Sequence, residues 1–454
     1  MGAEPRRYFA PAAWVNGGWA QDVLLTVGAD GLWSGIAPGA PAQARRGAQR
    51  LGGPVLPGLV NGHSHAFQRA IAGLTERCGG GEDDFWRWRD RMYSAANRIT
   101  PQQLESIAAF LYFELLRGGY THVCEFHYLH NGPDGRPYAN PLEMSLALVR
   151  AAQRVGIGLT LLPALYMRSG FGSDSLREDQ RRFASTPESV LRIAEAAGRL
   201  GGHVAAGVAL HSLRAVDAMA LREVAAAAGP DMPVHIHIAE QRREVEDCIV
   251  HHGVPPVEWL LGKVALDARW NLVHATQCTK AELDGVRGER ASIVLCPSTE
   301  ANLGDGIFDL PAWMGQSGSW AVGSDSHVTR GWPEELRLLE YSQRLALRQR
   351  NVAARAALCE SSAAALFQGA LEGGSAAAGR PLGGLAAGQR ADFVVVDTAS
   401  SALAGIPNDH LLDAIVFSSS GPGFSQVFVA GQALAGEDGA MRDAFVRAMN
   451  QLWS

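Results

Sequence analysis

Eight short apolar segments alternate with amphipathic helical patterns between Pro57 and Gln368, and this alternation restricts the folds open to the chain. The segments are almost continuously apolar, which is typical of strands buried on both faces of a parallel sheet. Strands joined through helices run parallel, because the helix returns the chain to the starting edge. The expected strands are residues 57–65, 119–126, 155–162, 203–211, 233–239, 270–274, 292–296 and 320–325. Eight such units predict an α/β fold, a (β/α)8 TIM barrel.

Capping residues mark the beginning of two intervening helices. Thr100 precedes Pro101 and Thr186 precedes Pro187, which gives each helix an N-cap and a proline in its first turn. The sequence predicts helices over residues 101–117, 187–200, 221–228, 333–350 and 351–368.

The two ends of the chain have a β-rich pattern. Residues 23–27 and 32–36 read as strands joined by the hairpin-type turn at 28–31, and further strands are expected at 391–397 and 425–431. We expect residues 1–56 and 379–454 to meet in one small β-sandwich-like domain. Residues 57–378 would then form the barrel.

Composition excludes several classes of protein. The chain of 454 residues has a net charge of −6 and no basic stripe, which argues against a nucleic-acid partner. No apolar run approaches the roughly 20 residues that span a membrane, and the N-terminus has no signal-type apolar region. We therefore expect a cytoplasmic protein. The scattered cysteines form no Cys-x-x-Cys pair and are interpreted as reduced thiols: Cys78, Cys124, Cys248, Cys278, Cys296 and Cys359.

Two histidines end the first expected strand. His63 and His65 are two residues apart, so their side chains share one face at its C-terminal end. His237 ends the fifth strand and Asp325 ends the eighth. Three imidazoles and one carboxylate are a suitable zinc set, and TIM barrels place their chemistry at this rim. We predict one Zn²⁺ per chain at these four side chains.

Two further polar residues lie at the same rim. Glu240 follows His237 by three residues, and His274 ends the sixth strand. Since the metal ligands are already assigned, both are interpreted as acid, base or polarising groups. His235 shares the face of His237 deeper in the barrel and is interpreted as a core histidine.

These motifs resemble those of the amidohydrolase superfamily. The segment 57–65 (PGLVNGHSH), His237-Ile238-Ala239-Glu240, His274 and Gly323-Ser324-Asp325 carry the resemblance, with the tail 384–397. It implies the mononuclear deaminase branch, with Asp325 also accepting the proton of the attacking water. Binuclear members use a carbamylated lysine at the end of strand four, whereas this strand ends in His211, and Lys263 and Lys280 lie elsewhere.

A narrower resemblance is to the formimidoylglutamate deiminase family. It rests on the segments 65–68 (HAFQ), 86–89 (WRWR), 125–128 (EFHY), 211–214 (HSLR) and 297–306 (PSTEANLGDG). The resemblance implies hydrolysis of N-formimino-L-glutamate to N-formyl-L-glutamate and ammonia, as in histidine degradation. The substrate-binding residues that it implies are Gln68, Arg89, Tyr128, His211 and Arg214.

The arginines agree with an acidic substrate. A small molecule with two carboxylates calls for guanidinium forks, and Arg214 lies three residues beyond a strand end. Arg89 lies in an expected helix, where a solvated charged face is the alternative interpretation. Two other functions stay open: a deaminase acting on a purine, adenosine-type or triazine substrate, and a barrel that only binds. We expect the enzyme to be a homodimer.

Overall fold

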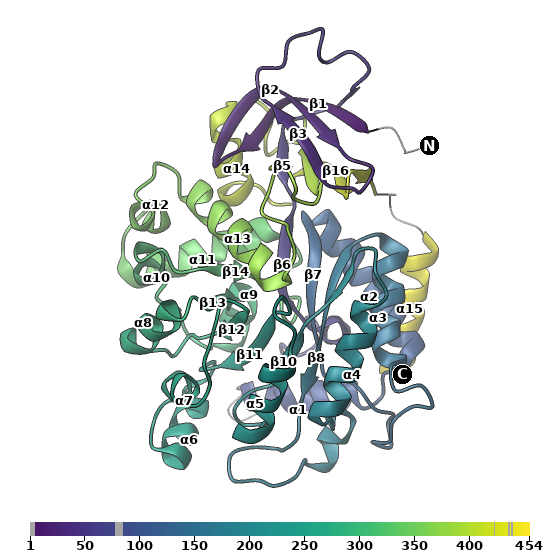
Figure 1. Cartoon of the computed structure of the whole chain (residues 1–454), viewed down its shortest axis with the longest axis vertical. Coiled ribbons are helices and arrows are strands. Elements are labelled where there is room, and N and C mark those ends of the chain that lie inside the picture. The colour runs from purple at the N-terminus through teal and green to yellow at the C-terminus, as the bar shows by residue number, and fades with distance from the viewer. Residues whose placement is uncertain (1–4, 78–84, 422, 435, 437–438) are drawn as a thin grey trace.

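A computed structural model of the chain describes residues 5–77, 85–421, 423–434, 436 and 439–454. A barrel wrapped by helices carries a small sheet at one end (Figure 1). The barrel strands within the described residues pair in parallel and in chain order. They are β6 (Leu59–Ser64), β7 (Tyr120–His127), β8 (Gly158–Leu165), β10 (Val208–Leu210), β11 (Val234–Ile238), β12 (Trp270–His274), β13 (Ser292–Leu295) and β14 (Trp320–Val322).

The barrel closes where three of the predicted metal ligands lie. A single bridge joins Ser64 to Asp325 between the ends of β6 and β14. Asp325 N–H donates to the His63 carbonyl at 3.0 Å, and His65 N–H donates to the Asp325 carbonyl at 3.2 Å. The α/β barrel prediction is confirmed.

Helices surround the sheet, and both predicted caps are confirmed. Thr100 accepts a hydrogen bond from Gln103 N–H, and Thr186 accepts one from Ser189 N–H. The helices that follow the barrel strands are α2 (Pro101–Arg117), α3 (Glu143–Val155), α4 (Pro187–Gly198), α5 (Ala218–Ala227), α6 (Arg242–His252), α7 (Pro256–Lys263), α8 (Lys280–Gly288), α9 (Pro297–Leu303), α10 (Leu310–Gly315), α11 (Trp332–Leu347), α12 (Val352–Ala356) and α13 (Ser362–Ala378). Near the rim lie η1 (Ala66–Ala70), α1 (Phe85–Ala96) and η2 (Glu178–Phe183).

Several predicted boundaries differ from the structure. The third strand begins at Gly158, because α3 continues to Val155 and ends at the left-handed Gly156 (φ 80°). The fourth strand is split at residue 207 into β9 (Val204–Ala206) and β10, and the eighth ends before Asp325. The helix predicted over 351–368 is two helices, because Ser361 caps the new helix α13 by accepting from Ala364 N–H.

Both chain ends contribute to the small sheet, in the order β17-β16-β15-β5-β1-β2-β3, with β4 beside β1. Central β5 joins the two halves by pairing with β1 and β15. The rings of Phe393 and Phe428 stack in this small domain, with their centroids 4.1 Å apart. The strands are β1 (Arg6–Val15), β2 (Gly18–Val27), β3 (Trp33–Ala37), β4 (Gln49–Arg50), β5 (Val55–Pro57), β15 (Phe393–Val396), β16 (Phe424–Val429) and β17 (Gln432–Ala433).

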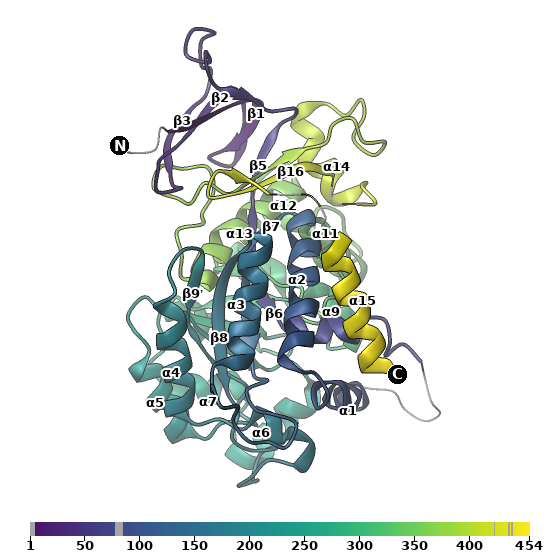
Figure 2. The same cartoon turned by 90° about the vertical axis from the view of Figure 1, so that its right-hand side faces the viewer.

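The C-terminal helix leaves this small domain. Figure 2 shows α15 (Gly439–Trp453), in yellow, lying along α2 of the barrel. The rings of Phe110 and Phe445 stack at 4.6 Å, and Trp453 Nε1 donates to the Ala70 carbonyl at 3.0 Å. The small domain was predicted to include all of residues 379–454. The structure differs at the end of this segment, because α15 packs on the barrel. Across the described ranges, no helix has the length and apolarity needed to cross a membrane.

Candidate metal centre and active site

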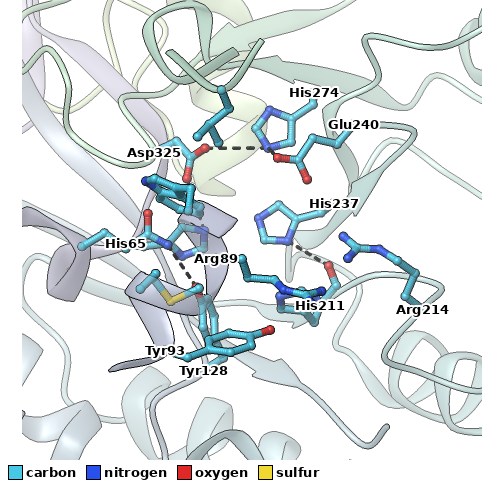
Figure 3. Close-up of a pocket in the computed structure, with 14 residues that line it drawn as sticks. His65, Arg89, Tyr93, Tyr128, His211, Arg214, His237, Glu240, His274 and Asp325 are labelled. Carbon is cyan, nitrogen blue, oxygen red and sulfur yellow. Dashed lines mark hydrogen bonds and ion pairs between the residues drawn. The ribbon is translucent and has the colours of Figure 1, made fainter. Parts of the chain in front are cut away.

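Four side chains from three strand ends converge at the C-terminal rim of the barrel (Figure 3 shows His65, His237 and Asp325). His63 Nε2 lies 3.1 Å from His65 Nε2 and 3.0 Å from His237 Nε2. Asp325 Oδ1 lies 3.5 Å from His63 Nε2 and 3.4 Å from His65 Nε2. Ligands about 2.0–2.1 Å from a tetrahedral zinc ion are about 3.4 Å apart. The distances from His63 to the other three predicted ligands, and from His65 to Asp325, are close to this spacing.

Hydrogen bonds orient the imidazoles of this group. His65 Nδ1 lies 2.7 Å from the Phe126 carbonyl, and His237 Nδ1 lies 2.9 Å from the His211 carbonyl. A carbonyl only accepts, so each Nδ1 carries the proton and each Nε2 presents a lone pair. Burial lowers the pKa of all three histidines, and those of His63 and His237 lie well below the usual range. Neutral nitrogens facing one another beside a carboxylate are the donor set that a metal cation needs.

The backbone is strained where functional side chains leave their strands. Asp325 (φ 45°) and His274 (φ 72°) adopt left-handed conformations, which cost about 1–3 kcal/mol and are concentrated at functional sites. Gly323 allows the close approach of the two barrel edges, because a Cβ there would lie 2.7 Å from the His63 backbone nitrogen.

Glu125, which the sequence analysis did not assign to the site, supports the ligand strand from β7. Its buried carboxylate accepts hydrogen bonds from Ser64 Oγ at 2.7 Å, Ala66 N–H at 2.6 Å and Tyr112 OH at 3.2 Å. Burial raises the pKa of Glu125 to about 8, although these hydrogen bonds oppose the shift. Glu125 therefore positions the residues on either side of His65.

Glu240 and His274 form a second group beside the ligands (Figure 3). His274 Nε2 lies 3.7 Å from Glu240 Oε1 and 3.8 Å from Asp325 Oδ2. Burial raises the pKa of Glu240 to about 7, although His274 and Arg214 oppose the shift. Burial acts to lower the pKa of His274, but Glu240, Glu300 and Asp325 outweigh it and raise the value to about 10. The site thus combines a carboxyl that exchanges protons near neutral pH with a cationic hydrogen-bond donor.

Glu300 is a second buried carboxylate that the sequence analysis did not assign to the site. From α9, its Oε1 lies 3.3 Å from His274 Nδ1 and accepts from Cys296 N–H at 2.8 Å. Glu300 therefore fixes the orientation of the His274 ring, as partners behind functional histidines commonly do.

Substitution Glu300→Gln is expected to lower kcat about 10- to 100-fold while leaving the metal content unchanged, because only the support of His274 is altered. Elemental analysis and steady-state kinetics measure both quantities. Exposed Glu289, changed to Gln, is the matched control. Loss of metal from the Glu300 variant would instead place this carboxylate in support of the metal ligands.

All five predicted substrate-binding residues line one cavity with the acid/base group. Gln68 Nε2 donates to Tyr128 OH at 3.1 Å, and the His211 and Tyr128 rings lie 5.3 Å apart. Figure 3 shows Asp325, His274 and Glu240 on one side of this cavity, with Arg89, Tyr128 and His211 on the other. Arg89 faces the cavity rather than a purely solvated surface. The cavity also has apolar and aromatic lining residues that were not predicted from the sequence: Trp88, Met92, Tyr93 and Leu303.

The model of the amidohydrolase family matches residues 55–434, which include the whole barrel and every residue of the candidate site. The chain belongs to the amidohydrolase family. It is therefore a hydrolase, and the family assignment accounts for the barrel, the rim histidines and the returning β domain together.

Three comparisons with individual proteins illustrate the similarity. Formimidoylglutamate deiminase of Pseudomonas aeruginosa is 46% identical over 453 residues, covering 98% of this chain and 99% of that protein. The crystal structure of an amidohydrolase from Brucella melitensis has a TM-score of 0.92 at 42% identity, over 99% of this chain and 100% of that one. An adenosine deaminase from Xanthomonas campestris with bound zinc has a TM-score of 0.79 at 20% identity, over 98% of each chain, and shares the fold.

Proposed function

We propose that this amidohydrolase is a zinc-dependent deiminase that converts N-formimino-L-glutamate and water to N-formyl-L-glutamate and ammonia. The observation that carries the proposal is the position of Arg89 and Arg214 in the same cavity as Glu240 and His274. A substrate with two carboxylates needs such guanidinium groups, whereas a purine needs amide or backbone partners. The full-length similarity to the Pseudomonas aeruginosa deiminase supports the same substrate.

One zinc ion per chain would be held by His63, His65, His237 and Asp325. The spacing and protonation of these side chains support this part of the proposal. When bound, the metal lowers the pKa of water and acts as a Lewis acid. The proton donors and acceptors of the reaction come from the protein, and the attacking oxygen comes from water.

The residues divide the proton transfers between them. Asp325 accepts the proton of the attacking water, whose oxygen forms a bond to the formimino carbon. Glu240 takes the remaining hydroxyl proton of the tetrahedral centre and carries it to the terminal nitrogen. The bond from carbon to that nitrogen then breaks to release ammonia as the formyl C=O forms, and Asp325 returns its proton to solvent. His274 donates from Nε2 to the water oxygen as the tetrahedral centre forms. The bond from carbon to the glutamate nitrogen stays intact, which gives the N-formyl product.

The charges of the cavity fit both ends of this substrate. An amidine is protonated near neutral pH, so the formimino group approaches Glu240 and Asp325 as a cation. The carboxylates of the substrate then face Arg89 and Arg214 on the other side (Figure 3). Such electrostatic complementarity favours one orientation of the substrate in the site.

Ammonia release from a substrate panel tests the proposal. The metal-loaded enzyme is expected to prefer N-formimino-L-glutamate over guanine, adenosine and triazine substrates. A higher kcat/KM for any of the ring compounds would contradict the proposed substrate. Only the broader assignment, a deaminase of this family, would then remain.

Substitutions Arg89→Met and Arg214→Met test the carboxylate contacts. Breaking a buried charge pair costs about 2–5 kcal/mol, or on the order of 30- to 4000-fold in kcat/KM. At least one variant should show this loss on formiminoglutamate and little loss on an analogue lacking the side-chain carboxylate. Arg192→Met, on the exposed face of α4, is the control. Wild-type kcat/KM in both variants would contradict the assignment.

We further infer that the enzyme is a cytoplasmic homodimer without nucleic-acid or membrane partners. The described cysteines are all free thiols, which is typical of a reducing compartment, while Cys78 lies outside the described residues. Leu345 and Leu358, on and next to the neighbouring helices α11 and α12, are 81% and 93% exposed and support an apolar contact between subunits. Light scattering of the purified protein tests the assembly, and a monomer would contradict it.

A further inference from the structure

Asp305 is a buried carboxyl group beside the acid/base pair that the proposed mechanism does not use. It is 3% exposed and follows α9, where its N–H donates to the Glu300 carbonyl at 2.9 Å. One carboxyl oxygen of Asp305, one of Glu240 and one ring nitrogen of His274 lie within 4.8 Å of one another. Asp305 does not line the cavity that Glu240 and His274 line. It is therefore placed to act on these two side chains rather than on the substrate itself.

The backbone on both sides of Asp305 holds it in this position. Gly304 (φ 71°) and Gly306 (φ 119°) have positive φ angles, which turn the chain sharply at Asp305. A Cβ at Gly306 would lie 2.9 Å from Gln277 Nε2. The Gln277 side-chain amide donates to the Asp305 carbonyl, and Gln277 N–H donates to the Ala239 carbonyl at 2.9 Å. These contacts join Asp305 to the loops that follow β11 and β12.

The two carboxyl oxygens of Asp305 have different surroundings. Oδ1 accepts a hydrogen bond from the side-chain amide of Gln241, the residue after Glu240. Oδ2 is buried and has no hydrogen-bond partner within the part of the chain that the structure describes. Burying a charged oxygen without a donor is costly, which favours the protonated form. Burial and the nearby Glu240 carboxyl raise the pKa of Asp305 to about 10, although His274 opposes the shift. Both observations favour an uncharged Asp305 near neutral pH.

We propose that Asp305 is a positioning residue for Glu240 and acts as an uncharged carboxylic acid. This inference rests on the proposed function, in which Glu240 transfers a proton to the departing nitrogen. The Asp305 hydroxyl can donate toward the Glu240 carboxylate, directly or through one water. Its Oδ1 holds the side chain of the adjacent Gln241. These contacts restrict the orientation of Glu240, and the uncharged form adds no second negative charge beside it.

The first experiment compares Asp305→Ala and Asp305→Asn in the full-length, metal-loaded enzyme. Asp305→Ala is expected to lower kcat for N-formimino-L-glutamate about 10- to 100-fold, with KM within about twofold and the metal content unchanged. Asparagine keeps the oxygen that accepts from Gln241 and places an N–H donor where the hydroxyl was. Asp305→Asn should therefore keep kcat within about threefold of the wild type. Asp231→Ala, at an exposed position before β11 and thus at the opposite end of the barrel, is the control.

A double-mutant cycle separates the positioning of Glu240 from a general structural role. The kcat of the double variant Asp305→Ala, Glu240→Gln is expected to lie within about threefold of that of Glu240→Gln alone. A substitution that merely disturbs the site would instead lower the residual activity of Glu240→Gln as much as it lowers wild-type activity. Gln241→Ala removes the contact to Oδ1 from its other side and should show the same dependence on Glu240. The inference therefore remains testable if Asp305→Ala does not fold.

Equal losses from Asp305→Ala in the two backgrounds would overturn the inference, as would wild-type kcat or loss of the metal in the single variant. A loss in Asp305→Asn as large as in Asp305→Ala would also overturn it, because the charged carboxylate would then be the active form. Thermal melting checks that each variant is folded. A wild-type enzyme that releases no ammonia from N-formimino-L-glutamate would overturn the proposed function itself, a result distinct from all of these.

Discussion

Substitution Asp325→Ala is expected to remove both the metal and turnover. In the proposed site, Asp325 places Oδ1 beside His63 and His65 and Oδ2 on the side of His274. The variant therefore loses one of four ligands and the proton acceptor together. General-base loss alone costs about 10²–10⁴-fold, and loss of the metal should bring kcat below detection.

Elemental analysis and ammonia release measure the two effects. The wild type is expected to hold one tightly bound equivalent of zinc, to lose activity with a chelator and to regain it with zinc. Asp443→Ala, on the exposed face of α15, is the control. Circular dichroism checks the fold of the Asp325 variant, because alanine tolerates the left-handed backbone poorly. Two equivalents of metal in the wild type, or full activity without any, would contradict the mononuclear account.

Substitution Glu240→Gln is expected to keep the metal and lower kcat about 10²–10⁴-fold. Glutamine has nearly the same shape but cannot carry a proton to the departing nitrogen. The backbone at this position is held independently of the side chain, because Glu240 N–H donates to Glu244 Oε2 and Thr276 Oγ1 donates to the Glu240 carbonyl. The loss should therefore report proton transfer rather than a rearranged site.

Metal analysis separates the two roles that Glu240 could have. Glu258→Gln, at an exposed position on α7, is a control for the change of charge. Loss of metal from the Glu240 variant would make it a ligand, and a near-normal kcat would remove it from the mechanism.

Local sequence patterns were sufficient for the barrel and its rim. Apolar runs located the strands, and side chains at the C-terminal ends of parallel strands must meet at one edge. His63, His65 and His237 could therefore be grouped before their distances were known. Asp325 lies beside the histidines of β6 although β14 ends before it, because the barrel closure holds its backbone there.

Contacts between distant segments could not be predicted in this way. Glu125 reaches Ser64 across the β6–β7 pairing, and Glu300 reaches His274 from α9. Neither partner follows from the periodicity of its own segment. The path of α15 was missed for the same reason, since an amphipathic helix does not specify which surface covers its apolar face.

Product analysis shows which carbon–nitrogen bond of the substrate the enzyme breaks. The metal-loaded enzyme is incubated with N-formimino-L-glutamate, and the products are identified by proton NMR together with an ammonia assay. If Glu240 protonates the terminal nitrogen as proposed, we expect equal amounts of N-formyl-L-glutamate and ammonia. L-glutamate and formamide, formed by breaking the other carbon–nitrogen bond, would contradict it.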